Sequence, residues 1–411
     1  MAPDLSEIDE EEIHFSNIVT TFRNYARYSL TANNRRRKDI YRLPKADQDV
    51  LEQLGYKQKL DEVDNAIRVN AEFLGQIVAN PEIFGPDQAV EEDEEDDTRV
   101  LHDHAEDPGP SHSHSHSHPH TRSSHTHDHS HEAHSPGQRK KYKPTDFDMD
   151  KLRSTLKQFV RDWSEEGTEE REACYTPMKD ALVNHFSNIP AEERGRLRVL
   201  VPGAGLGRLA YDIAKMGFAC QGNEFSHYML LASYFILNRT DSIGKHTFYP
   251  YVHSFSNVPS RSAMLRAVSI PDVLPSDLPS GSNFSLVAGD FEEIYGADSD
   301  PAEPQSGQWD AILTCFFIDT AKNIVNYLRV IHRILAPGGV WINLGPLLWH
   351  FENNNTNDLS VELDLEEVKA LARTIGFELS NEKTIDTTYT SNPQGMLGYV
   401  YNAAFWTATK I

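Results

Sequence analysis

Residues 199–210 read VLVPGAGLGRLA, an apolar run that stops at Pro202 and is followed by three glycines at alternate positions. This pattern predicts a buried strand that ends in a tight turn, with a helix beginning directly after it. The backbone N–H groups at such a helix start are available to a ligand. A nicotinamide dinucleotide fingerprint, G-x-G-x-x-G, would need glycine at 208, where Arg208 stands. Taken alone, the turn fits a ligand site and a plain structural corner equally well.

Strand-like and helix-like segments alternate from this turn to the end of the chain. Continuous apolar runs at 284–291 and 309–319 are separated from the next run by a helical pattern at 321–335. Such alternation predicts an α/β fold, with a mostly parallel sheet covered by helices on both faces. The last two runs, 382–390 and 398–410, have only a short link between them. We therefore expect an antiparallel hairpin at the C-terminal end of the sheet.

The chain divides into three regions by composition. Residues 1–86 have helical periodicity, with apolar residues such as Phe22 and Tyr25 on one face, and these helices need an apolar surface to cover. Residues 87–142 contain an acidic run and a Ser/His repeat without periodicity, so we expect a disordered insert. A flexible repeat lacks the fixed geometry of a structural metal site, and we expect no bound metal. Residues 143–411 hold all of the alternating segments.

A further helix is expected just before the glycine turn. Residues 147–163 carry an apolar stripe at helical spacing, and an Asp such as Asp148 is the expected cap. Gln158 and Arg161 are three residues apart, so they are neighbours on another face of this helix.

Polar and aromatic residues follow three other predicted strands. Open α/β sheets bind ligands beyond the carboxyl ends of their strands, so we expect these residues near the glycine turn. Glu224 could accept hydrogen bonds from both hydroxyls of a ribose. Asp290 could accept from an adenine amine, with Phe291 packed on the ring, and Cys315 could form the opposite wall. Each also has a structural alternative: Glu224 as a solvated strand end, Asp290 as a helix cap and Cys315 as a core residue.

Composition restricts the class of partner and the compartment. The formal net charge of −23 disfavours nucleic acid as a primary partner, since phosphate binding needs a basic surface. Three cysteines are too few for a disulfide framework and suit a reducing compartment such as the cytosol. The N-terminal residues lack the features of a signal peptide, and no apolar run reaches the length that spans a bilayer. We expect no membrane partner.

The order of glycine turn, ribose acid, adenine acid and Pro-Gly-Gly turn resembles class I S-adenosylmethionine-dependent methyltransferases. Longer phrases resemble one family, the carnosine N-methyltransferases, from residue 147 to the C-terminus and weakly over the N-terminal helices. The resemblance implies a Rossmann-like seven-stranded sheet and S-adenosylmethionine as the cofactor. It also implies methyl transfer to the imidazole of carnosine (β-alanyl-histidine), giving anserine and S-adenosylhomocysteine. The phrases are FDMDKLRSTLKQFVRDWSEEG (147–167), CQGNEFS (220–226), AGDFEEIY (288–295), TCFFIDTA (314–321) and INLGPLLWHFE (342–352).

One position departs from the superfamily pattern. Many members carry an acid two residues before the first glycine, where this chain has Val201. We expect Gln158, Arg161 and Arg208 to take over by binding the methionine carboxylate of the cofactor, a contact that suits guanidinium groups. The expected cofactor-binding residues are Gln158, Arg161, Gly203, Gly205, Arg208, Glu224, Asp290, Phe291 and Cys315.

Asp319 is the expected catalytic group. An acceptor for the N–H of one imidazole nitrogen leaves the lone pair on the other nitrogen and also stabilises the imidazolium product. The resemblance assigns substrate contact to Asp319, His350, Tyr399 and Tyr401, with His350 as a second catalytic candidate, and we add Tyr389. Three alternatives remain: Asp319 as the cap of the following helix, His350 as a surface histidine, and the paired tyrosines as one face of an edge strand.

The long stretch between the second and third predicted strands is expected to form a lid over a small substrate. Two other functions stay open: methylation of histidine in proteins or peptides, and a catalytically inactive scaffold that binds the cofactor. A homodimer is also left open. A nuclear fraction beside the cytosolic one is implied by the resemblance alone.

Overall fold

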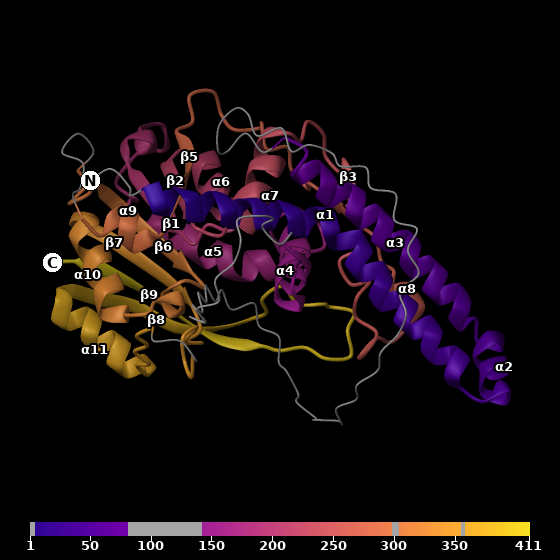
Figure 1. The fold of residues 1–411 in the computed structure, drawn as a ribbon. Helices are drawn as coiled ribbons and strands as arrows, with labels where there is room; N and C mark the ends of the chain where they lie inside the picture. Colours follow the sequence, from indigo (N-terminus) through magenta and orange to yellow (C-terminus); the bar gives the residue numbers. More distant parts are fainter. Residues whose placement is uncertain (1–4, 81–141, 298–303, 355–357) are drawn as a thin grey trace.

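The computed structural model describes residues 5–80, 142–297, 304–354 and 358–411 (Figure 1). The insert predicted at 87–142 lies outside these ranges except for its last residue, so its disorder stays a prediction. None of the helices within the described ranges is both long and apolar enough to cross a membrane. The same ranges contain no group of three or more His, Cys, Asp or Glu side chains placed to hold a metal ion.

A seven-stranded sheet forms the centre of the molecule. Its strands are β1 (Arg198–Pro202), β2 (Ala219–Glu224), β5 (Phe284–Ala288), β6 (Trp309–Cys315), β7 (Leu335–Gly345), β8 (Phe377–Thr387) and β9 (Tyr401–Lys410). They lie in the order β5-β2-β1-β6-β7-β9-β8. The first five are parallel, and β9 runs antiparallel to both β7 and β8. The predicted parallel sheet with a C-terminal antiparallel hairpin is confirmed.

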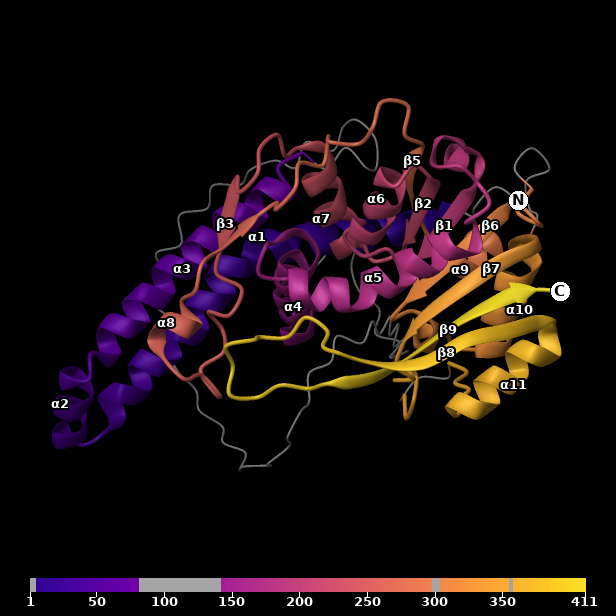
Figure 2. The same cartoon turned by 180° about the vertical axis from the view of Figure 1, so that it is seen from behind.

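Helices cover both faces of this sheet, as the alternation predicted (Figures 1 and 2). On one face α5 and α6 bury apolar residues against β1, β2 and β6, and on the other α9, α10 and α11 pack against β6, β7 and β9. Continuous apolar strands require such cover on both sides. The helices are α4 (Asp146–Trp163), α5 (Thr168–His185), α6 (Arg208–Lys215), α7 (His227–Asn238), α9 (Phe291–Tyr295), α10 (Ile324–Ile334) and α11 (Leu365–Ile375).

Helix α4 begins with a capping box that differs from the prediction. Thr145 is the N-cap, and its side chain accepts a hydrogen bond from the backbone N–H of Asp148. The Asp148 carboxylate in turn accepts from the backbone N–H of Thr145 at 2.8 Å. The prediction of Asp148 as the cap itself is therefore wrong by three residues: Asp148 is the third residue of the helix and the second member of the capping box.

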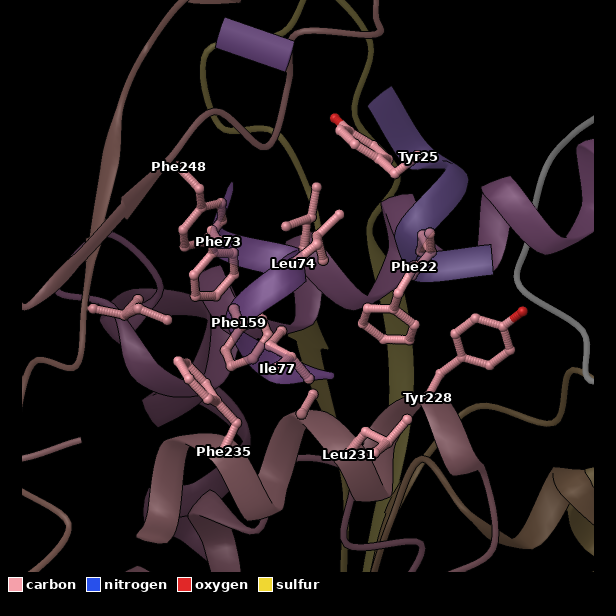
Figure 3. Close-up of a cluster of buried hydrophobic side chains, with 14 of the residues drawn as sticks. Phe22, Tyr25, Phe73, Leu74, Ile77, Phe159, Tyr228, Leu231, Phe235 and Phe248 are labelled. Carbon is pink, nitrogen blue, oxygen red and sulfur yellow. The ribbon is translucent and has the colours of Figure 1, made fainter. Parts of the chain in front are cut away.

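The N-terminal region is helical, as predicted: α1 (Leu5–Arg42), α2 (Lys45–Gln53) and α3 (Tyr56–Ile77). Helices α1 and α3 lie side by side and project beyond the sheet, with α2 at their far end (Figure 1). Their apolar faces pack against α4, α7 and a small sheet, as Figure 3 shows. Phe73 of α3, for example, stacks on Phe248 with ring centroids 5.0 Å apart. The region is thus joined to α4, α7 and the small sheet through one apolar cluster.

The stretch predicted to form a lid is built into this same core. It contains β3 (His246–Phe248), α8 (Arg261–Met264) and β4 (Val268–Ile270), and β3 pairs with β4. Met264 and Ile270 are buried against the N-terminal helices. In this structure the stretch is therefore a platform that packs against α1 and α3, and its role as a lid stays a prediction.

Candidate functional site

The glycine turn joins β1 to α6 in backbone conformations that favour glycine. Gly203, Gly205 and Gly207 have φ angles of +65°, +56° and +79°. A Cβ atom on Gly203 would lie 2.6 Å from Cδ2 of Phe317, so a side chain there would displace that ring. The turn therefore brings the main chain close to neighbouring groups, as a ligand site of this type requires.

Glu224, the last residue of β2, is fixed beside this turn. Its Oε2 accepts a hydrogen bond from the backbone N–H of Gly205 at 2.9 Å. Its Oε1 accepts from the N–H groups of Phe225 at 2.9 Å and Ser226 at 2.8 Å. Burial raises the pKa of Glu224, and these three bonds act in the opposite direction. A carboxylate has about four acceptor sites, so Oε2 keeps one for a ligand hydroxyl.

A small cavity of about 30 Å³ lies at the turn, and we call it the turn cavity. Six of the predicted site residues line it. Helix α4, the glycine turn, the end of β6 and the segment after β8 therefore meet there. The lining residues are Gln158, Arg161, Asp162, Tyr175, Val201, Gly203, Ala204, Gly205, Leu209, Cys315 and Tyr389.

Arg161 is the buried cation of the turn cavity, with 4% of its surface exposed. Its Nη1 donates to Oδ1 of Asp162 at 2.9 Å and to the hydroxyl of Tyr175 at 3.0 Å. The guanidinium also lies over the ring of Tyr389, 4.9 Å from its centroid. Within the described ranges, Nη2 has no hydrogen-bond partner, and Nε has only the Glu170 carboxylate of an ion pair, 3.6 Å away. Buried donors of this kind are costly until an acceptor reaches them, so the geometry fits an anionic ligand group.

Arg208, the other predicted arginine, binds partners outside the turn cavity. It donates to Asp272 at 2.6 Å, to Asp212 at 2.9 Å and to the carbonyl of Asp162 at 2.9 Å. It is not among the residues that line the turn cavity. Its ion pair with Asp272 ties α6 to the segment after β4, and its hydrogen bond to the carbonyl of Asp162 ties α6 to the end of α4, so it supports the cavity from outside.

Asp290 and Phe291 lie at the start of α9. Oδ1 of Asp290 accepts from the backbone N–H of Glu292 at 2.8 Å, so the helix-cap alternative is confirmed for this residue. Phe291 is buried, and its ring centroid lies 5.4 Å from that of Phe317. Their contact with an adenine stays a prediction.

Asp319 lies in a short 3-10 helix, Ile318–Thr320, with 3% of its surface exposed. Its Oδ2 accepts from the backbone N–H of Leu348 at 3.0 Å, and its carbonyl accepts from the N–H of His350 at 3.0 Å. Burial raises the pKa of Asp319 to about 7. Asn323 caps the next helix, so the idea that Asp319 is merely that cap is wrong.

Three aromatic rings form a cluster beside the turn cavity. The ring of Phe316 lies 4.7 Å from that of Tyr389 and 5.6 Å from that of Tyr401. Phe316 has a φ of +53°, a strained value for an aromatic residue that is typical of functional sites. Burial raises the pKa of Tyr401, and the negative charge of Asp319 acts in the same direction.

Tyr399 differs from Tyr401. It precedes β9 and has 49% of its surface exposed. β9 lies between β7 and β8, so the alternative that both tyrosines form a face of an edge strand is wrong. The structure thus places Tyr401 against Phe316, and substrate contact by Tyr399 stays a prediction.

Sequence reasoning missed Glu170 of α5. Its carboxylate accepts from the Thr388 hydroxyl at 2.5 Å and from the backbone N–H groups of Thr390 at 2.6 Å and Ser391 at 3.0 Å. It also lies 3.6 Å from Nε of Arg161. Glu170 therefore holds the segment that carries Tyr389 over the turn cavity. No local pattern signals this contact, because Glu170 and Thr388 are 218 residues apart.

The rest of the loop between β8 and β9 contacts the platform, the stretch between β2 and β5 that contains β3, α8 and β4. The backbone N–H of Met396 donates to the carbonyl of Asn257 at 2.9 Å, and Arg266 donates to Asn392 at 3.2 Å. Figures 1 and 2 both show this loop reaching under α4 toward α8. Two segments far apart in the sequence thus enclose the same side of the molecule.

Comparison with known proteins gives a consistent set of matches. Residues 138–411 match a family model described as carnosine N-methyltransferase. The mouse carnosine N-methyltransferase is 50% identical over 267 residues, which cover 64% of this chain and 64% of the mouse protein. Proteins of the same name from fission yeast and Dictyostelium discoideum are 37% and 34% identical, over 97% and 96% of this chain and 96% and 75% of their own lengths.

Proposed function

Because this chain belongs to the carnosine N-methyltransferase family, we propose that it transfers a methyl group from S-adenosylmethionine to the imidazole of carnosine. The products are anserine and S-adenosylhomocysteine. The observation that carries the proposal is the buried carboxyl group of Asp319, three residues after Phe316, whose ring contacts that of Tyr389 at the turn cavity. The imidazole nucleophile needs to be oriented and does not need a strong base. A buried carboxyl group can supply that orientation.

The residues present fit the cofactor. The unpartnered N–H groups of Arg161 would bind the methionine carboxylate, with Gln158 beside them. Glu224 would accept from a ribose hydroxyl through the free site on Oε2, and Cys315 would form a wall of the cavity. We propose that Asp290 and Phe291 bind the adenine end. When bound, the cofactor supplies a methyl group on a sulfonium, which is already electrophilic.

Asp319 performs the orienting step. The carboxylate accepts the N–H of one imidazole nitrogen and so keeps the lone pair on the other nitrogen, which points to the methyl group. Imidazole has a reference pKa of about 6.5, so the neutral ring is abundant near neutral pH. As the ring becomes positively charged, the same carboxylate stabilises it in a site shielded from water. His350, Tyr389, Tyr399 and Tyr401 are the proposed walls of the substrate site.

The pH dependence of kcat/KM for carnosine tests this role. Below pH 7, Asp319 becomes protonated, since its pKa is raised to about 7, and can no longer accept the imidazole N–H as a carboxylate. Carnosine itself becomes protonated near pH 6.5, about the reference value for imidazole. Both losses act in the acid direction, so a plot of log kcat/KM against pH should approach a slope of about two below pH 6.

The variant Asp319→Asn retains only the titration of the substrate, so its residual activity should give a slope of about one in the same range. Steady-state kinetics in buffers of constant ionic strength measure both slopes. A slope of one in the wild-type enzyme would show that Asp319 is not one of the two titrating groups.

A further inference from the structure

The carboxylate of Glu170 contacts both the segment after β8 and the cation of the turn cavity. Glu170 lies in the first turn of α5, with 11% of its side chain exposed. Its Oε1 accepts a hydrogen bond from the backbone N–H of Thr390, and the same oxygen lies 3.6 Å from Nε of Arg161. Its Oε2 accepts from the hydroxyl of Thr388 and from the N–H of Ser391. One side chain therefore joins this segment to Arg161.

The segment needs such support because its backbone is strained at Thr390. This residue has a φ of +48°, in the left-handed region that a β-branched residue rarely adopts. A conformation of this kind costs free energy and persists only where the surrounding contacts impose it. The carboxylate of Glu170 binds the N–H of Thr390 and the N–H of the next residue, Ser391. It therefore acts on the backbone at the strained position itself.

Tyr389 lies between two of the residues that Glu170 holds, so the same contacts set its position. Its side chain lines the turn cavity. The ring centroid lies 4.7 Å from that of Phe316 and 4.9 Å from the guanidinium carbon of Arg161. A change in the turn that Glu170 holds would move the Tyr389 ring relative to both neighbours.

We propose that Glu170 is a positioning residue, which holds the turn after β8 so that Tyr389 forms a wall of the carnosine site. The first half, that Glu170 holds the turn, concerns the residues alone. The second half rests on the proposed function, because it takes carnosine as the substrate. Glu170 acts through Tyr389 and makes no contact with the reacting atoms in this account.

A positioning role predicts a change in KM and little change in kcat. Without the carboxylate, the turn is correctly placed in only a fraction of the molecules, and the apparent affinity for a ligand that needs it falls in proportion to that fraction. Saturating carnosine selects the correct form, so kcat recovers. Loss of folded protein has the opposite signature, since it lowers the apparent kcat and leaves KM unchanged. The two constants therefore separate positioning from a purely structural role.

Glu170→Gln in the full chain is the test variant. Glutamine keeps the length of the side chain, but its NH₂ group replaces one acceptor oxygen, so a donor of the segment loses its partner. We expect KM for carnosine, at saturating S-adenosylmethionine, to rise about 10- to 100-fold, as for a turn correctly placed in about 1–10% of the molecules. The change in kcat should stay below about threefold. Amide hydrogen exchange, followed by mass spectrometry, should become faster in the peptide that contains residues 388–391.

Glu169→Gln is the matched control. Glu169 lies in the same first turn of α5 and is exposed, so the substitution removes the same charge from the same helix end. It should leave KM and the exchange rate unchanged. Thr388→Val removes one donor to Glu170 and keeps the shape of the side chain, and it replaces Glu170→Gln as the test variant if that chain does not fold.

Two further substitutions test the route through the turn. Tyr389→Leu should raise KM for carnosine by itself, and Glu170→Gln added to it should raise KM no further, because both remove the same wall. Thr390→Gly should lower the KM of Glu170→Gln again, because glycine adopts a positive φ without strain.

Wild-type hydrogen exchange in Glu170→Gln would overturn the first half of the proposal. Faster exchange with an unchanged KM, or additive effects of Glu170→Gln and Tyr389→Leu, would overturn the second half. If the wild-type chain does not methylate carnosine, the proposed function fails instead, and the exchange measurement still decides whether Glu170 holds the turn.

Discussion

Asp319→Asn should lower kcat for carnosine by about 100- to 10,000-fold, the range that positioned proton-binding groups contribute. Asparagine keeps the shape, and its carbonyl oxygen can still accept from the backbone N–H of Leu348, a bond of 3.0 Å in the wild-type chain. Its NH₂ group replaces the acceptor that the imidazole N–H needs, so it favours the wrong tautomer. Kinetics, product chromatography and thermal melting measure the effect together.

Asp364→Asn is the matched control for this substitution. Asp364 caps α11 through the backbone N–H of Glu367, and asparagine caps about as well as aspartate. The control should therefore keep both its rate and its melting temperature. Asp319→Asn with a normal rate and a single normal product would contradict the catalytic role, whereas equal loss of rate and of stability would show that Asp319 is structural.

Arg161→Gln should have the largest effect on cofactor binding. Removal of a buried charged partner costs about 2–5 kcal/mol, which corresponds to a Kd for S-adenosylhomocysteine that is roughly 30- to 5,000-fold higher. The Kd of Arg161→Lys should lie between those of the wild-type chain and of Arg161→Gln, because lysine keeps the charge but loses the planar fork that fits a carboxylate. Calorimetry on the folded variants gives the three constants.

Arg208→Lys separates the two arginines that the sequence offered. Arg208 is held by Asp212 and Asp272 outside the turn cavity, so its replacement should lower the melting temperature and leave the Kd nearly unchanged. Wild-type affinity in Arg161→Gln would contradict our account, in which Arg161 binds the methionine carboxylate. A large loss of affinity in a stable Arg208→Lys protein would contradict it as well.

Features encoded by local pattern could be predicted from the sequence. The glycine turn, the helix that carries Gln158 and Arg161, and the parallel sheet all follow from periodicity and turn chemistry over short stretches. The position of Glu224 followed from the rule that parallel strands end at one edge of the sheet. These elements also converge in the structure, where Gly205 donates a hydrogen bond to Glu224.

Features set by contacts between distant segments could not be predicted. Arg161 and Arg208 look alike in sequence, and only the tertiary ion pairs with Asp272 show that Arg208 is occupied. The contacts of Glu170 with the segment after β8, and of Cys174 with Thr387, join residues from separate elements. Turn-rich composition suggested a lid between β2 and β5. How this stretch packs is decided by its burial against the N-terminal helices.

The most direct test of the central claim is the destination of a labelled methyl group. The full chain is incubated with methyl-labelled S-adenosylmethionine and carnosine, and in parallel with a cell extract freed of small molecules. We predict label in a dipeptide that co-elutes with anserine, in amounts equal to the S-adenosylhomocysteine formed, and almost none with Asp319→Asn. Label confined to proteins of the extract would contradict the claim in favour of a protein-histidine methyltransferase, and label in neither fraction would leave only a scaffold that binds the cofactor.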